Sequence, residues 1–252
     1  MLRTLLLIVG AALGASAAAA GEGRVHEGAS VLALSWQPAF CERARRAREC
    51  AEPGRNGGRE RLYRADGFAL HGLWPQPRSR AYCDVPARVR RTDERRRWRD
   101  LPALGLPREM RPALARAMPG AWSFLHRHEW VKHGTCYSPG DPARYFADSL
   151  RLQAIVNQSA VGALFASHVG RPITARALRL AFDSAFGVGA GARVRMACRD
   201  DGRRRLVAEI TLGMAGDLSR VTNAASLGEA MRRARTTQAG CPRGIVDPPG
   251  FQ

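Results

Sequence analysis

The side chains best suited to chemistry lie in one short segment, residues 126–136, which reads HRHEWVKHGTC. On a helix, residues three and four apart share a face. Glu129 is therefore expected beside Lys132 and His133, and His128 should also meet Lys132. Such a group suits proton transfer near a phosphate. An imidazole can donate or accept a proton near neutral pH, an ammonium supplies positive charge, and a carboxylate sets the charge and orientation of the imidazole.

A second segment, residues 71–75 with the sequence HGLWP, places His71 at the end of a predicted strand. Trp74 follows three residues later and offers an aromatic face on which a base or a sugar could stack. A lone histidine on an apolar strand is more often a partly buried core residue. Two separate imidazoles, however, are what a general acid–base pair requires. We therefore predict that His71 is a second catalytic imidazole.

A zinc site is an alternative for the first segment, because His128, Glu129 and His133 look like the HExxH signature of metalloproteases. The two histidines are one residue too far apart, which separates them by about 140° on an ideal helix and prevents them from sharing a metal ion. His126 and His128 could bind a metal from a strand, but no further cluster of ligands is evident. The sequence therefore predicts no metal and no cofactor.

The elements that must position these segments show strand and helix patterns in turn. Short apolar or alternating runs predict strands, and Asp141-Pro142 predicts a helix start because aspartate caps the first turn and proline fits it. Asp201-Gly202 predicts a hairpin turn. The predicted strands are 31–36, 68–74, 192–198 and 205–212, and the predicted helices are 43–49, 107–118, 121–136, 141–158, 161–168 and 174–186. Strands at both ends with helices between them predict an α+β fold.

The composition is that of a globular protein with a large positive charge. The 252 residues include 40 Lys plus Arg against 22 Asp plus Glu, a net charge of +18, and every basic residue except Lys132 is arginine. This composition excludes collagen-like, coiled-coil and wholly disordered chains. The charge favours polyanionic partners such as nucleic acid, anionic lipid or acidic polysaccharide. The basic run 88–99 is expected to be a solvated helix face or loop, and a glycine-rich loop is expected at 53–58.

The N-terminus indicates export. Residues 1–20 combine a positive start, an apolar stretch and three alanines before Gly21, which is the pattern of a cleaved signal peptide. The apolar stretch is too short to span a bilayer as an anchor. Residues 21–252 are expected to form a single soluble catalytic domain that acts as a monomer, in the periplasm or outside the cell and not in a membrane.

Six cysteines remain after signal cleavage, and an even number in an oxidising compartment predicts disulfide bonds. Fifteen pairings are possible from the sequence alone, and no CxxC spacing indicates a zinc or redox site. The six are Cys41, Cys50, Cys83, Cys136, Cys198 and Cys241.

The two histidine segments together resemble the active-site segments of the ribonuclease T2 family, whose members are secreted, metal-independent endoribonucleases. Phe68–Pro75 is similar to the first segment and His128–Cys136 to the second, in the same order and with a similar separation. The resemblance extends to Trp36–Pro38 near the N-terminus and to residues 186–212 near the C-terminus. It thus covers nearly the whole chain after the signal peptide.

The resemblance implies a role for each site residue. His71 matches the base that activates the ribose 2′-hydroxyl, and His133 matches the acid that protonates the 5′-leaving oxygen. Glu129 and Lys132 match the residues that stabilise the pentavalent phosphorane. The substrate-binding residues implied are His128 for phosphate, Trp74 for stacking on the base 5′ of the cut, and Gln76 where some relatives have an acidic residue that contacts the base.

The reaction implied is cleavage of single-stranded RNA by transphosphorylation to a 2′,3′-cyclic phosphate, followed by hydrolysis to a 3′-phosphate. The 2′-hydroxyl is a nucleophile already beside the phosphorus, which explains RNA rather than DNA as substrate. Gln76, and Ser35 in place of a glutamine, imply low base specificity. The family also implies a central antiparallel β-sheet packed with several α-helices, and the disulfides Cys41–Cys50, Cys83–Cys136 and Cys198–Cys241.

Two hypotheses of other classes stay open from the sequence. A non-catalytic, basic RNA-binding protein would use its charge as its function and would form no cyclic phosphate from RNA. A metal-dependent hydrolase would be inhibited by a chelator.

Overall fold

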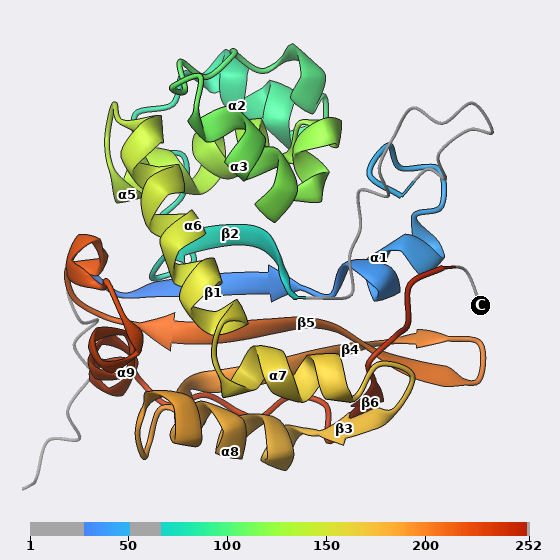
Figure 1. Cartoon of the computed structure of the whole chain (residues 1–252). Coiled ribbons are helices and arrows are strands. Elements are labelled where there is room, and N and C mark those ends of the chain that lie inside the picture. Colours follow the sequence, from blue (N-terminus) through green and yellow to red (C-terminus); the bar gives the residue numbers. More distant parts are fainter. Residues whose placement is uncertain (1–27, 51–66, 251–252) are drawn as a thin grey trace, which may run out of the picture.

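The structure is a computed structural model that describes residues 28–50 and 67–250 (Figure 1). The predicted signal peptide and the predicted loop at 53–58 lie outside the described residues. Strands near both ends of the described chain join in one sheet, and most helices lie between them in the sequence. The predicted α+β class is therefore confirmed.

A sheet of six strands forms the centre of the fold. The strands are β1 (Ser30–Ser35), β2 (Ala69–Pro75), β3 (Pro172–Thr174), β4 (Val194–Asp201), β5 (Arg204–Met214) and β6 (Arg243–Ile245). Their order is β2-β1-β5-β6-β3, with β4 also paired to β5. The pairs are antiparallel except β5 and β6, so the sheet is mixed rather than wholly antiparallel. The parallel pair arises because the chain returns to β6 through a long helical connection instead of a hairpin.

The four predicted strands are confirmed as β1, β2, β4 and β5. The predicted turn at Asp201-Gly202 joins β4 to β5, and Gly202 adopts the left-handed conformation with φ of 57°. The three-residue strands β3 and β6 were not predicted, because a run that short has no readable period.

The two faces of the sheet differ in their side chains. Leu32 and Leu34 of β1 and Ile210 and Leu212 of β5 are fully buried in the core beneath the helices. Successive residues of a strand point to opposite faces. Glu209 of β5 therefore lies on the other face, where it is partly exposed. This second face carries the candidate site.

Most predicted helices are present with shifted ends. The side chain of Asp141 caps its helix as predicted by accepting a hydrogen bond from the Arg144 amide. The basic run 88–99 is largely exposed, as expected, on one helix and one 3-10 turn. The basic run lies on α2 (Ala87–Glu94) and the 3-10 turn η1 (Trp98–Asp100). The other helices and 3-10 turns outside residues 119–137 and α1 are α3 (Met110–Ala117), α6 (Pro142–Asn157), α7 (Ala160–Ser167), α8 (Ala175–Phe186), η4 (Gly191–Arg193), η5 (Leu218–Arg220) and α9 (Ala224–Arg233). Figure 1 shows α2 and α3 at one end of the sheet, and α7 and α8 at the other.

One predicted helix is misplaced. The sequence suggested a helix over 43–49, whereas α1 covers Gln37–Arg43. Pro38 occupies its first turn, where its missing N–H would be unpaired in any helix. The proline that ends β1 therefore also starts α1. Residues 44–50 form turns instead, and these bring Cys50 to Cys41.

The long helix predicted over 121–136 is broken into four pieces. They are η2 (Pro119–Ser123), α4 (Leu125–Glu129), the π-helical turn η3 (Trp130–Gly134) and α5 (Thr135–Tyr137). Phe124, with φ of 64°, adopts a left-handed conformation that separates η2 from α4. In η3 the Trp130 ring packs onto Gly134, where a Cβ would lie 2.3 Å from the ring. The wider turn changes which residues share a face, so simple helical spacing does not describe this segment.

The three disulfides implied by the family resemblance are confirmed: Cys41–Cys50, Cys83–Cys136 and Cys198–Cys241. The second joins the loop after β2 to α5, so it connects the two segments that carry the predicted site. Within the described ranges, no helix is long and apolar enough to cross a membrane.

Candidate active site

The two histidine segments meet around the carboxylate of Glu129, at the end of α4. Its Oε1 lies 3.7 Å from Nε2 of His71 and 3.8 Å from Nε2 of His128. Its Oε2 accepts a hydrogen bond of 2.9 Å from the indole N–H of Trp74. The Trp74 ring also packs between two imidazoles, at 5.2 Å from His71 and 5.6 Å from His133 between ring centres. Five of the seven predicted site residues therefore form one cluster.

A bulge in β2 turns His71 toward this cluster. The register between β1 and β2 shifts between Ala33 and Leu34, because Ala33 pairs with Gly72 and Leu34 pairs with Leu70. His71 is left without a partner in the ladder, which is how a bulge re-aims a side chain.

Gly72 allows Glu129 to approach the strand. A Cβ at this position would lie 1.9 Å from Oε2 of Glu129 and 2.7 Å from Nε1 of Trp74. Any side chain at residue 72 would therefore displace the central carboxylate. This close approach explains the glycine that follows His71 in the sequence.

Glu129 is almost completely buried, with 1% of its side chain exposed. Burial raises its pKa. The positive charges of His71 and His128 oppose this rise, as do the hydrogen bond from Trp74 and the charge of Lys132. The carboxylate is thus stabilised in its charged form only by the groups that surround it. It contacts His71, His128 and Trp74 directly, whereas helical spacing had suggested Lys132 and His133.

His133 lies in a different electrostatic environment. Burial lowers its pKa, and the charges of Lys132, His128 and His71 lower it further, to about 3. Its Nδ1 is buried and has no hydrogen-bond partner within the described part of the chain. His133 is therefore a neutral imidazole at physiological pH.

His71 pairs with a carboxylate that the sequence analysis did not single out. Its Nδ1 lies 2.6 Å from Oε2 of Glu209 on β5. Burial lowers the pKa of His71, but the hydrogen bond to Glu209 and the charges of Glu129 and Glu209 outweigh burial and the charge of Arg199, so the pKa is raised. The alternation of β5 already placed Glu209 among the outward-facing residues, but nothing in the sequence indicated which side chain it would meet.

His128 is held by a second residue that sequence reasoning missed. The side chain of Asp93 on α2 is fully buried, and its two oxygens lie 2.7 and 2.9 Å from Nδ1 of His128. The Tyr82 hydroxyl donates to the same carboxylate at 2.8 Å. Trp98 stacks on the His128 ring at 4.7 Å between ring centres. The only sequence signal for Asp93 was an acidic residue within an arginine-rich run.

Lys132 lies on η3 next to these groups. Its backbone oxygen accepts a hydrogen bond of 2.9 Å from the Tyr82 amide. Its ammonium has no hydrogen bond or ion pair in the described ranges, although its charge acts on both Glu129 and His133. The cluster thus contains a cation that is available to an anionic ligand.

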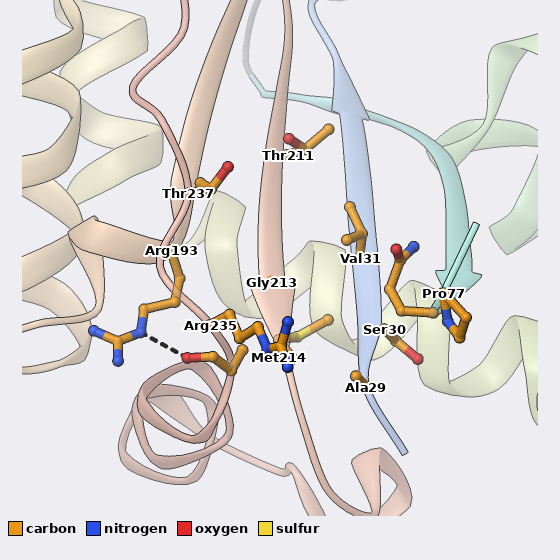
Figure 2. A pocket seen from close by; sticks show the side chains of 12 residues that line it. Ala29, Ser30, Val31, Pro77, Arg193, Thr211, Gly213, Met214, Arg235 and Thr237 are labelled. Atoms are coloured by element: carbon orange, nitrogen blue, oxygen red, sulfur yellow. Dashed lines mark hydrogen bonds between the residues drawn. The ribbon is translucent and has the colours of Figure 1, made fainter. Parts of the chain in front are cut away.

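Gln76 lies just beyond the cluster, where β2 ends. Its side-chain amide donates to the Trp74 carbonyl at 3.2 Å. It also lines a cavity of about 270 Å³ on the open face of the sheet, shown in Figure 2. The floor includes Val31, Thr211 and Gly213, and no carboxylate among the described residues lines it. Two arginines, Arg193 and Arg235, also line this cavity, whereas the indole N–H of Trp74 faces the carboxylate of Glu129.

No group of three or more histidine, cysteine, aspartate or glutamate side chains suited to a metal ion occurs among the described residues. The site contains an imidazole with a raised pKa, an imidazole with a lowered pKa, a buried carboxylate, a third imidazole and an ammonium. Together they provide a proton donor, a proton acceptor and positive charge around one small space.

Comparison with curated proteins identifies relatives. The model of the Ribonuclease T2 family matches residues 28–225. Ribonuclease I of Escherichia coli (strain K12) is 32% identical over 215 residues, which are 74% of this chain and 75% of that protein. A ribonuclease of Aeromonas hydrophila is 34% identical over 107 residues, 42% of this chain and 35% of its own length.

Solved structures show the same fold. Japanese pear S3-RNase has a TM-score of 0.52 and 17% identity, with 85% of this chain and 96% of that chain covered. A mutant of RNase MC1 in complex with 5′-GMP has a TM-score of 0.51 and 18% identity, with 86% and 98% covered. From the matched family model and the similarity to ribonuclease I, the chain belongs to the ribonuclease T2 family and is an endoribonuclease.

Proposed function

We propose that the protein cleaves single-stranded RNA by transphosphorylation, with His71 and His133 as the acid–base pair, and that it hydrolyses the cyclic product to a 3′-phosphate. The observation that carries this proposal is the placement of two imidazoles of opposite charge preference on either side of the Trp74 ring. Glu129 and the ammonium of Lys132 lie beside them. This is the set of groups that in-line transfer at a phosphate requires.

The electrostatics favour a particular division of roles. The raised pKa of His71 favours its protonated form, which suits a proton donor. The pKa of His133, lowered to about 3, keeps that imidazole neutral, which suits a proton acceptor. We therefore assign His133 as the base and His71 as the acid, the reverse of what the family resemblance implied. The acid and base of such a pair must occupy opposite protonation states before the reaction begins.

In the proposed cleavage step, one proton moves to His133 and another leaves His71. Nε2 of neutral His133 takes the proton of the ribose 2′-hydroxyl as this oxygen bonds to phosphorus, since its Nδ1 is buried. The bond from phosphorus to the 5′-oxygen breaks, its electron pair stays on that oxygen, and His71 supplies the proton. Lys132 and His128 stabilise the phosphate charge, and the charge of Glu129 favours the protonated form of His71.

The substrate preference follows from the same groups. The reaction needs a 2′-hydroxyl, so DNA cannot serve as a substrate. We propose that Trp74 supports the base on the 5′ side of the cut and that Gln76, with the cavity beside it, accommodates the edge of that base. A glutamine amide can both donate and accept hydrogen bonds, so it discriminates weakly among base edges, in agreement with low base specificity.

We also propose that residues 1–20 are a signal peptide, that 21–252 form one catalytic domain, and that the domain acts as a monomer in the periplasm or outside the cell without a metal. The three disulfides support export, because disulfide bonds persist in oxidising compartments.

The decisive experiment is incubation of single-stranded RNA with the purified protein in the presence of EDTA. Products with 2′,3′-cyclic phosphate ends are expected, and His71→Ala and His133→Ala should each reduce the rate by more than about 100-fold while RNA affinity is largely kept. Inhibition by EDTA would favour a metal-dependent hydrolase. Binding without any product would favour a non-catalytic RNA-binding protein.

A further inference from the structure

Glu209 and His71 meet across an intervening strand. His71 lies on β2 and Glu209 on β5, and β1 separates the two strands. Neighbouring strands are about 4.8 Å apart, so the two side chains must together reach over β1. Glu209 pairs with Ser35, and His71 lies in the bulge opposite Ala33 and Leu34, so the contact passes over residues 33–35 of β1.

The contact has the geometry of a charge-assisted hydrogen bond. Nδ1 of His71 and Oε2 of Glu209 are 2.6 Å apart, and their side chains are 33% and 22% exposed. A carboxylate can only accept, so His71 must carry its Nδ1 proton there. The other ring nitrogen, Nε2, then points toward Glu129 at 3.7 Å and toward the cluster. The orientation of the ring is thus set by Glu209 and not by the catalytic groups.

We propose that Glu209 is a positioning residue that fixes the ring of His71 and keeps it charged, so that Nε2 is the proton donor to the leaving oxygen. The proposal rests on the acid–base chemistry proposed above. It goes further by assigning a role to a residue of β5, outside both histidine segments.

Other charged groups also face His71 and must be taken into account. Glu129 on α4 acts on it from one side, Arg199 on β4 opposes the two carboxylates, and the charge of His71 in turn acts on His133 of η3. Of these groups, Glu209 alone makes a short hydrogen bond to the ring within the described residues. Removing the charge of Glu209 therefore changes the pKa of His71 while the side chains of Glu129, Lys132 and His133 are left unaltered.

The test compares Glu209→Gln with the wild type on a dinucleoside monophosphate over a range of pH. Glutamine keeps the length and an acceptor oxygen but removes the charge. We expect the alkaline limb of kcat/KM to move to lower pH, with activity about tenfold lower on that side and unchanged on the acid side. Glu209→Asp should restore part of the alkaline activity. Glu229→Gln, the same change at an exposed residue of α9, should match the wild type.

A second measurement does not depend on activity. The ring protons of His71, assigned with His71→Ala, can be followed by NMR titration in the wild type and in Glu209→Gln. The variant is expected to titrate at lower pH. An unchanged titration, or a pH profile in which the alkaline limb does not move, would overturn the proposal. If the wild type cleaves no RNA while the titration still shifts, the proposed function fails and the pairing of Glu209 with His71 stands.

Discussion

The hydrogen bond between His128 and Asp93 of α2 allows a quantitative prediction for Asp93→Asn. The Asp93 side chain is fully buried, accepts from the Tyr82 hydroxyl at 2.8 Å and bonds to His128 at 2.7 Å. Asparagine has nearly the same shape but carries no charge, and one side of its amide cannot accept a hydrogen bond. The substitution therefore weakens the contact that orients His128 without creating a cavity.

The size of the effect follows from the two bonds. A hydrogen bond to a charged group contributes about 1.5–3 kcal/mol, and asparagine keeps one neutral acceptor. We expect the free energy of unfolding to fall by about 1.5–3 kcal/mol. If His128 holds the phosphate before and during the reaction, KM should rise about tenfold while kcat changes much less, because the weaker binding applies equally to ground and transition states.

The assay is steady-state cleavage of RNA by Asp93→Asn beside Glu94→Gln. Glu94 is the next residue of α2, but it is exposed and pairs with Arg90, so it makes a matched control for the removal of one carboxylate. Thermal unfolding of both variants reports the structural part of the effect. An Asp93→Asn variant that is destabilised but has the KM of the control would refute a role for Asp93 in phosphate binding.

Three further predictions follow from the site. Lys132→Arg should lower kcat about tenfold, because a planar guanidinium cannot replace a compact ammonium beside a reorganising phosphate; full activity would mean that any cation suffices. Gly72→Ala should reduce kcat/KM more than about 100-fold and destabilise the fold by about 1–3 kcal/mol, since its Cβ would meet Glu129, and a crystal structure would show whether the carboxylate has moved. Arg88→Gln/Arg91→Gln, at two exposed positions of α2, should make the salt dependence of RNA binding shallower by about 0.7 for each RNA phosphate that these arginines neutralise in the wild type, and an unchanged slope would assign them to solvation alone.

The local pattern of the chain determined much of this protein. Strand periods and turn residues predicted four of the six strands, and capping signals such as Asp141-Pro142 predicted the main helices. These features depend on neighbours in the sequence, so they can be read without the fold. The two histidine segments, each only a few residues long, were enough to indicate the family and its catalytic residue types.

Local reasoning failed where packing decides the backbone. The segment 121–136 looked like one helix, yet Phe124 and the packing of Trp130 on Gly134 divide it. Pro38 looked like the end of a strand, but it also begins α1. In both places the helix period was present in the sequence, and backbone conformation and side-chain packing at single residues changed where the helix begins or breaks.

The partners of His71 and His128 could not be predicted from the sequence, because they lie far away along the chain. Glu209 is 138 residues from His71, and Asp93 is 35 residues from His128. Each pair forms only because the strand order and the placement of α2 bring the two side chains together. The sequence by itself determined which imidazoles are present and what reaction they suit. The tertiary structure decided which imidazole has a raised pKa and which a lowered one, because burial and neighbouring charge set those shifts and neither can be read along the chain.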